Sequence, residues 1–168
     1  MSEKEQLAWS SYFPALMACI GSSKGPVLEL GVGHFSTPSL HTLCYSLGRS
    51  LMSIEENEEW IRKFQKLESK QHRFHKMSFK EFVSVYGNMK WSVAFIDNSP
   101  GGKHRADCFD YLLPYSDYVV VHDYEKENEE HIAPLLHKAK FVHVTSTYEP
   151  KTLVASMTHQ IPTSIICL

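Results

Sequence analysis

Three side chains that can carry protons lie at the ends of two apolar segments. Asp97 follows the run 91–96, and His122 and Asp123 follow the run 117–121. A carboxylate or a neutral imidazole can accept a proton near neutral pH, so each suits general base catalysis. We therefore take Asp97, His122 and Asp123 as the candidate catalytic residues.

A loop with two glycines follows an earlier apolar run, 27–30. Gly31 and Gly33 allow the backbone to turn tightly and to approach a bound ligand closely. The helix expected after this loop offers free N–H groups at its start. The loop is therefore a candidate ligand site.

An acid follows the next apolar run as well. Glu55 lies 22 residues after Gly33, and a carboxylate at that place can accept hydrogen bonds from both hydroxyls of a ribose. Dinucleotides and S-adenosylmethionine both use this arrangement. The dinucleotide fingerprint has a third small residue at its sixth position, and here that residue is Ser36. Glu29, before the glycines, suits the positive ammonium and sulfonium of S-adenosylmethionine better than a pyrophosphate.

Secondary-structure elements have to bring these residues to one edge of a sheet. The chain alternates between short apolar runs, which are typical of strands, and segments whose apolar residues recur at helical spacing. Strands are predicted at 27–30, 50–54, 72–77, 91–96 and 117–121, and helices at 40–47, 60–67, 79–86, 104–113 and 132–139. This alternation predicts an α/β fold, a Rossmann-like sandwich of three layers with helices on both faces of a parallel sheet. The runs 141–144 and 152–155 predict an antiparallel hairpin at the end of the chain. In such a sheet, ligands bind beyond the carboxyl ends of the strands.

The sequence resembles the class I S-adenosylmethionine-dependent methyltransferases over roughly positions 25 to 157. The matching segments are 29–37, 53–55, 94–97 and 119–123. The resemblance implies a mostly parallel sheet of seven strands with the last strand antiparallel, and S-adenosylmethionine as the cofactor.

The resemblance also implies roles for single residues. It assigns Glu29, Gly31 and Gly33 to the methionine end of the cofactor and Glu55 to the ribose. Glu56, one position later in the sequence, is the alternative to Glu55. The remaining residues of the predicted cofactor site are His34, Ser36, Thr37, Ser78 and Asp97. Ser78 would flank the adenine, where related proteins often have an acid.

The pair Asp97 and Asp123 also resembles the ligands of the metal-dependent O-methyltransferases similar to the catechol enzyme. Those enzymes have an Asp-Asn pair after the fifth strand, and here Tyr124 follows Asp123. Two carboxylates and waters are able to hold Mg²⁺, but one ligand of the pattern is missing. We leave the metal open.

Simpler structural roles compete with these functional ones. Asp97 could cap a turn, and Asp123 could cap a helix that starts near Lys126. Glu55 begins the acidic run 55–59, which could serve the N-terminus of a helix. Lys103, His104 and Arg105 form either a solvated helix start or a contact for an anionic substrate.

Length and composition limit the function classes. The 168 residues predict one domain, 1–168, and the net charge of -2 argues against a nucleic-acid-binding surface. No apolar stretch reaches the roughly 20 residues of a membrane helix, so we expect no membrane partner. The absence of a secretory signal pattern and of paired cysteines predicts a cytoplasmic protein. We expect a small-molecule acceptor and allow for a homodimer that completes an open site.

The sequence therefore predicts an S-adenosylmethionine-dependent methyltransferase acting on oxygen or nitrogen of a small, non-polymeric acceptor. Two alternatives stay open. One is a nicotinamide-dependent oxidoreductase, which Glu29 and Ser36 disfavour. The other is a non-catalytic protein of the same fold that binds the cofactor or serves as a partner subunit.

Overall fold

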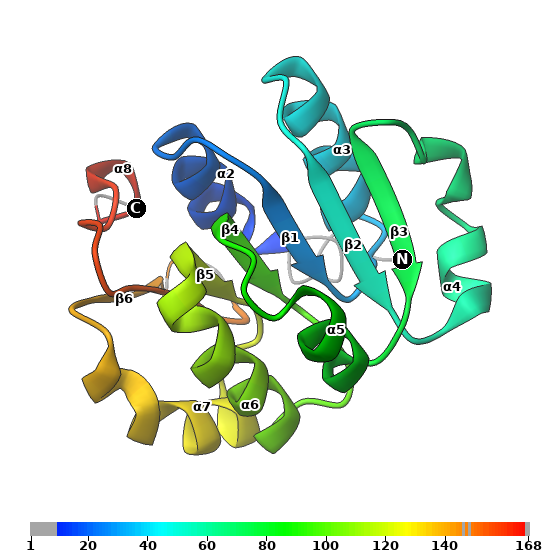
Figure 1. Ribbon diagram of the computed structural model, residues 1–168. Coiled ribbons are helices and arrows are strands. Elements are labelled where there is room, and N and C mark those ends of the chain that lie inside the picture. Colours follow the sequence, from blue (N-terminus) through cyan, green and yellow to red (C-terminus); the bar gives the residue numbers. More distant parts are fainter. Residues whose placement is uncertain (1–9, 146, 148, 167–168) are drawn as a thin grey trace.

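Five parallel strands and an antiparallel hairpin form one sheet in the order β3-β2-β1-β4-β5-β7-β6 (Figure 1). The computed structural model describes residues 10–145, 147 and 149–166. The strands are β1 (Val27–Leu30), β2 (Leu51–Glu55), β3 (His72–Lys76), β4 (Trp91–Ile96), β5 (Ser116–Val121), β6 (Phe141–Thr145) and β7 (Thr152–Ser156). β7 lies between β5 and β6 and runs antiparallel to both. The predicted fold class, a seven-stranded α/β sheet with a C-terminal antiparallel hairpin, is confirmed.

Helices cover both faces of the sheet, as Figure 1 shows. One face carries α5 (Phe79–Tyr86), α6 (Lys103–Leu112) and α7 (Lys126–Ile132). The other carries α2 (Phe13–Gly21), α3 (Ser36–Ser46) and α8 (Thr163–Ile166), while the short α4 (Glu58–Arg62) follows β2. Every side chain of β1 and β4 is buried, as expected of central strands covered on two sides.

Two predicted helices are shorter than the apolar periodicity suggests. The stripe at 60–67 forms α4 and then the 3₁₀ turn η1 (Gln65–Leu67). The stripe at 132–139 is divided between α7 and the 3₁₀ segment η3 (Ala133–Lys138). Pro134 explains the second change, because it has no N–H to continue the α-helical hydrogen bonds. A third 3₁₀ turn, η2 (Leu113–Tyr115), precedes β5.

The ladder of backbone hydrogen bonds continues past the ends of the central strands. Gly31 N donates to Ile54 O at 2.9 Å, and Asp97 N donates to Leu30 O at 2.8 Å. His122 N donates to Ile96 O at 3.1 Å. The loop glycine, Asp97 and His122 are therefore aligned at one edge of the sheet. Among the described residues, no helix is long and apolar enough to cross a bilayer.

Candidate active site

A cavity of about 580 Å³ opens at this carboxyl edge. Its walls come mainly from the loops after β1, β2, β4 and β5, with Tyr12 from the segment before α2 and Pro150 from the connection between β6 and β7. Its size falls within the range of pockets that bind small molecules and cofactors. Eight of the predicted site residues line this cavity: Gly31, Gly33, His34, Ser36, Glu55, Asp97, His122 and Asp123.

The glycine loop passes directly against the end of β4. Gly31 has a φ of +91°, and a Cβ there would lie 2.6 Å from the carbonyl oxygen of Asp97. Only glycine satisfies both the left-handed backbone and this close approach. The floor of the cavity therefore depends on Gly31.

The Glu55 carboxylate is fixed by two backbone amides. Val32 N donates to Oε2 at 3.2 Å, and Asn57 N donates to Oε1 at 2.8 Å. The acid thus faces the glycine loop across the cavity, and each oxygen retains lone pairs for further donors. Glu56 is exposed and lines only a narrow cleft of about 20 Å³ beside Met77 and Phe79. This geometry favours Glu55 over Glu56 as the residue that faces a ligand in the main cavity.

Glu29 lies behind the glycine loop, where it is fully buried, and it is not among the residues that line the cavity. Thr37 Oγ1 donates to its Oε1 at 2.9 Å, and Ser53 Oγ donates to Oε2 at 2.5 Å. Thr37 Oγ1 in turn accepts a hydrogen bond from Gly33 N at 2.9 Å. Burial raises the pKa of Glu29 to about 7, although hydroxyl donors from Ser53, Ser36 and Thr37 oppose that shift. Glu29 and Thr37 therefore shape the loop from beneath.

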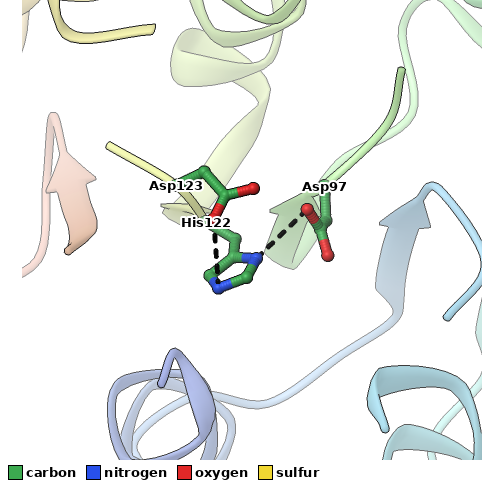
Figure 2. Close-up of side chains that lie close together, drawn as sticks. All are labelled: Asp97, His122 and Asp123. Atoms are coloured by element: carbon green, nitrogen blue, oxygen red, sulfur yellow. Dashed lines mark hydrogen bonds and ion pairs between the residues drawn. The ribbon is translucent and has the colours of Figure 1, made fainter. Parts of the chain in front are cut away.

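The ring of His122 lies between two carboxylates, as Figure 2 shows. Its Nδ1 is 3.2 Å from Asp97 Oδ1, and its Nε2 is 3.6 Å from Asp123 Oδ1. Nε2 is also 3.1 Å from Ser11 Oγ, a hydroxyl that donates to Pro150 O at 2.7 Å. The three predicted catalytic residues are thus brought together, and the ring is oriented from both sides.

Arg105 holds the ends of β4 and β5 together and is a residue whose role the sequence prediction missed. Its Nε donates to Asn98 O, and its Nη1 donates to His122 O, both at 2.8 Å. Nη2 is 3.0 Å from Asp97 Oδ1, and Nη1 is 3.5 Å from Asp123 Oδ2.

The alternative of a solvated helix start is wrong for Arg105, because the residue is only 6% exposed. A signal was present in the sequence. Arg105 shares the spacing i, i+3, i+4, i+7 with Cys108, Phe109 and Leu112, which form the buried face of α6.

Neither aspartate serves the simple capping role considered above. Asp97 Oδ1 accepts from Arg105 and His122, as described. The N-cap of α7 is Glu125, so Asp123 does not hold that position. Asp123 instead has a left-handed backbone with φ of +54°, a conformation that Asp tolerates better than most residues.

Asp97, His122 and Asp123 also offer the donor types of a cation site, with ligand atoms that lie within 4.8 Å of one another. However, the guanidinium of Arg105 already contacts both carboxylates. A divalent cation would have to enter beside a fixed positive charge, which Coulomb repulsion opposes. As arranged here, the residues do not fit Mg²⁺.

Other residues differ in how close they lie to the cavity. Ser78 is the N-cap of α5 in a capping box with Glu81 and lines neither the cavity nor the narrow cleft. Ser36 is buried and contributes to the wall, and exposed His34 packs its ring 5.1 Å from that of Trp60. Trp60 and Tyr12 also line the cavity, and the sequence prediction did not place them in the site.

Comparisons with solved structures identify the fold. Human methyltransferase-like protein 13 in complex with SAH matches with a TM-score of 0.66 and 12% identity, over 91% of this chain and 86% of that one. The SAH-bound Podospora anserina methyltransferase PaMTH1 matches with a TM-score of 0.66 and 10% identity, over 95% and 80% of the two chains. A spermidine synthase in complex with the transition state analogue AdoDATO has a TM-score of 0.67 and 12% identity, over 98% of this chain and 64% of that one.

The chain therefore has the class I S-adenosylmethionine-dependent methyltransferase fold, as the resemblance predicted. Because the sequence identities are only 10–12%, the similarity to these structures shows the fold alone. No family model matches the sequence, and no curated protein matches it.

Proposed function

We propose that the protein is an S-adenosylmethionine-dependent methyltransferase that acts on oxygen or nitrogen of a small acceptor. The observation that supports this most strongly is the single cavity shared by the Gly31 loop, the amide-held Glu55 and the Asp97–His122 pair. In this fold, that edge of the sheet combines a place for the cofactor with side chains that can move a proton.

The residues that suit the cofactor lie on one side of the cavity. Gly31 lets the loop after β1 lie directly against Asp97 at the floor of the cavity, and Glu55 presents carboxylate oxygens to the hydroxyls of a ribose. When bound, S-adenosylmethionine supplies a methyl group activated by its sulfonium. The protein then has to align the acceptor and exclude water.

The residues that suit the acceptor lie at the ends of β4 and β5. Asp97 accepts from His122 Nδ1, which leaves Nε2 as the basic nitrogen of a neutral ring. Ser11 Oγ is the present neighbour of that nitrogen and gives its own proton to Pro150 O, so it can only accept from Nε2. Nε2 therefore acts as a base only after an acceptor hydroxyl or amine has displaced Ser11 from this point. We infer that His122, oriented by Asp97, takes the proton from the acceptor as the new bond to carbon forms.

The nicotinamide-dependent oxidoreductase is the weaker alternative. Dinucleotide-binding sheets of the doubly wound type have the strand order 3-2-1-4-5-6, whereas this sheet ends in an inserted antiparallel strand. A non-catalytic protein of the same fold is the other alternative, and it predicts cofactor binding without turnover. A small acceptor is supported by the cavity's volume and by the net charge of -2.

Transfer of a labelled methyl group tests the proposal directly. The protein is incubated with methyl-labelled S-adenosylmethionine and a panel of phenols, alcohols and amines, and both labelled product and S-adenosylhomocysteine are measured. We expect turnover on one acceptor class and a loss of about a hundredfold in His122→Gln, the range for a missing general base. His131→Gln, which changes an exposed histidine, is the control. Binding without turnover across the panel would favour the non-catalytic alternative.

A homodimer that completes the open cavity is a further part of the proposal. Light scattering with and without S-adenosylhomocysteine tests it, because a dimer that closes the site is expected to be stabilised by the ligand. A monomer at all concentrations would remove this part and leave the proposed reaction standing.

A further inference from the structure

The charges at the ends of β4 and β5 form a compact group. Asp97 and Asp123 bring two carboxylates to the cavity wall, and their side chains are 23% and 43% exposed. Arg105 brings one buried guanidinium, whose side chain is 7% exposed. Two carboxylates close together repel each other, so their arrangement needs a cation nearby.

The donors of Arg105 show that its side chain is fixed between these groups. Two of its nitrogens bind the backbone carbonyls of Asn98 and His122, which anchors the guanidinium to both strand ends. The same fork then reaches the two carboxylates, at 3.0 Å for Asp97 and 3.5 Å for Asp123. A guanidinium is always charged and offers five donors in a rigid plane, so it can serve all four partners at once.

We propose that Arg105 is the resident cation of this site: its guanidinium takes the place that a divalent metal would need between Asp97 and Asp123. The donor set Asp97, His122 and Asp123 has the right types of atom for Mg²⁺ or Mn²⁺. A metal would have to displace the Arg105 contact from Asp97 Oδ1 or be held directly beside the guanidinium. The site is therefore metal-independent because of Arg105.

This assignment gives Arg105 a positioning role toward the proposed base. Asp97 Oδ1 accepts from both Arg105 Nη2 and His122 Nδ1, so the arginine fixes the oxygen that orients the imidazole. That role rests on the proposed function. The exclusion of metal does not, since it follows from the charges alone.

Titration with Mn²⁺ tests the exclusion without any acceptor. Arg105→Gln removes the charge and keeps hydrogen-bond donors, and Arg105→Lys keeps the charge and is the matched control. We expect the wild type and Arg105→Lys to show no site for Mn²⁺ at the cavity. Arg105→Gln should bind one Mn²⁺ per chain at least about tenfold more tightly than the wild type, because the repelling charge is gone.

The double variant Arg105→Gln/Asp97→Asn separates this site from unspecific binding to exposed acids such as those at 55–59. It should lose the Mn²⁺ site that Arg105→Gln gains. Tight binding of Mn²⁺ by the wild type in the cavity would overturn the proposal. Failure of a folded Arg105→Gln to bind Mn²⁺ would overturn it too, since the guanidinium would then not be what excludes the metal.

A second measurement does not depend on whether Arg105→Gln folds. Paramagnetic Mn²⁺ broadens NMR signals near its binding site. In the wild type, the imidazole signals of His122 should stay sharp in millimolar Mn²⁺, and selective broadening would contradict the proposal. Titration with S-adenosylhomocysteine on the same samples reports on the proposed function separately, so the two ideas can fail independently.

Discussion

Glu29 is a buried carboxyl group whose three polar neighbours are the uncharged hydroxyls of Ser53, Ser36 and Thr37. Thr37 and Ser53 donate to its two oxygens. Ser53 Oγ is also 2.9 Å from His72 Nε2, and burial lowers the pKa of His72 to about 4, so this imidazole is neutral at physiological pH. The hydroxyls satisfy the hydrogen-bonding capacity of the carboxyl oxygens, but they do not neutralise the negative charge of the ionised group. This environment explains why burial raises the pKa of Glu29 to about 7.

The raised pKa predicts how stability depends on pH. The ordinary pKa is 4.5, so folding favours the protonated form, and the wild type loses stability as the pH rises from about 4.5 to about 7. Glu29→Gln removes the ionisation. It should unfold at a higher temperature than the wild type at about pH 9, by an amount worth up to about 3 kcal/mol, and lose most of this advantage near pH 5.

Thermal unfolding across this pH range measures the difference, with Glu59→Gln as a control on the exposed surface. A difference between Glu29→Gln and the wild type that stays constant with pH would show that Glu29 does not titrate in this range.

At the scale of the secondary-structure elements, the shape of the cavity depends on the close packing of the loop after β1 against the end of β4. A Cβ at Gly31 would lie 2.6 Å from the carbonyl oxygen of Asp97, and the φ of Gly31 is +91°. Gly48 also has a positive φ, +65°, but nothing lies within 4 Å of its Cβ position. Comparing substitutions at these two glycines therefore separates the cost of a left-handed backbone from the cost of a steric clash.

Gly31→Ala should therefore cost more than Gly48→Ala. We expect Gly48→Ala to lower the free energy of unfolding by about 1–2 kcal/mol from the left-handed backbone alone. Gly31→Ala should lower it by about 3 kcal/mol or more, because β4 or the loop must also move. It should weaken S-adenosylhomocysteine binding as well, while Gly48→Ala leaves the affinity unchanged.

Urea denaturation and calorimetry measure both effects. Equal stability losses and equal affinities in the two variants would contradict the importance of the contact between the loop and β4.

The elements themselves were predictable where one signal dominated. The predicted bounds of the strands agree with the structure to within one residue at either end, because a short apolar run between two turns is typical of a buried strand. The helix predicted at 132–139 was wrong in its type because Pro134 outweighs apolar spacing. The role of Arg105 was missed because a basic cluster usually indicates solvent, although its position on the buried face of α6 pointed inward.

The candidate site was predictable in its place but not in its contacts. Acids after parallel strands indicate one edge of a sheet, and that is where Glu55, Asp97 and Asp123 lie. The sequence could not show that Glu29 lies behind the loop or that Ser11 and Pro150 meet beside His122. The contacts of Ser11 join residues more than 100 positions apart, and no local pattern encodes them.

At the scale of the whole molecule, the fold and the cavity support the proposed cofactor. The sheet order is that of the class I methyltransferases, and the cavity lies at its carboxyl edge. Glu55 faces that cavity, whereas its neighbour Glu56 is exposed beside a narrow cleft. The central claim is therefore that the cavity binds S-adenosylmethionine through Glu55.

Calorimetric titration tests that claim most directly, with S-adenosylmethionine, S-adenosylhomocysteine and NAD as ligands. The proteins compared are the wild type, Glu55→Ala and the control Glu56→Ala. We predict that the wild type binds both adenosyl ligands and not NAD. Glu55→Ala should weaken this binding by about tenfold or more, since hydrogen bonds to a charged acceptor are lost, and Glu56→Ala should leave it unchanged. Binding of NAD in place of the adenosyl ligands, or a loss caused by Glu56→Ala and not by Glu55→Ala, would contradict the claim.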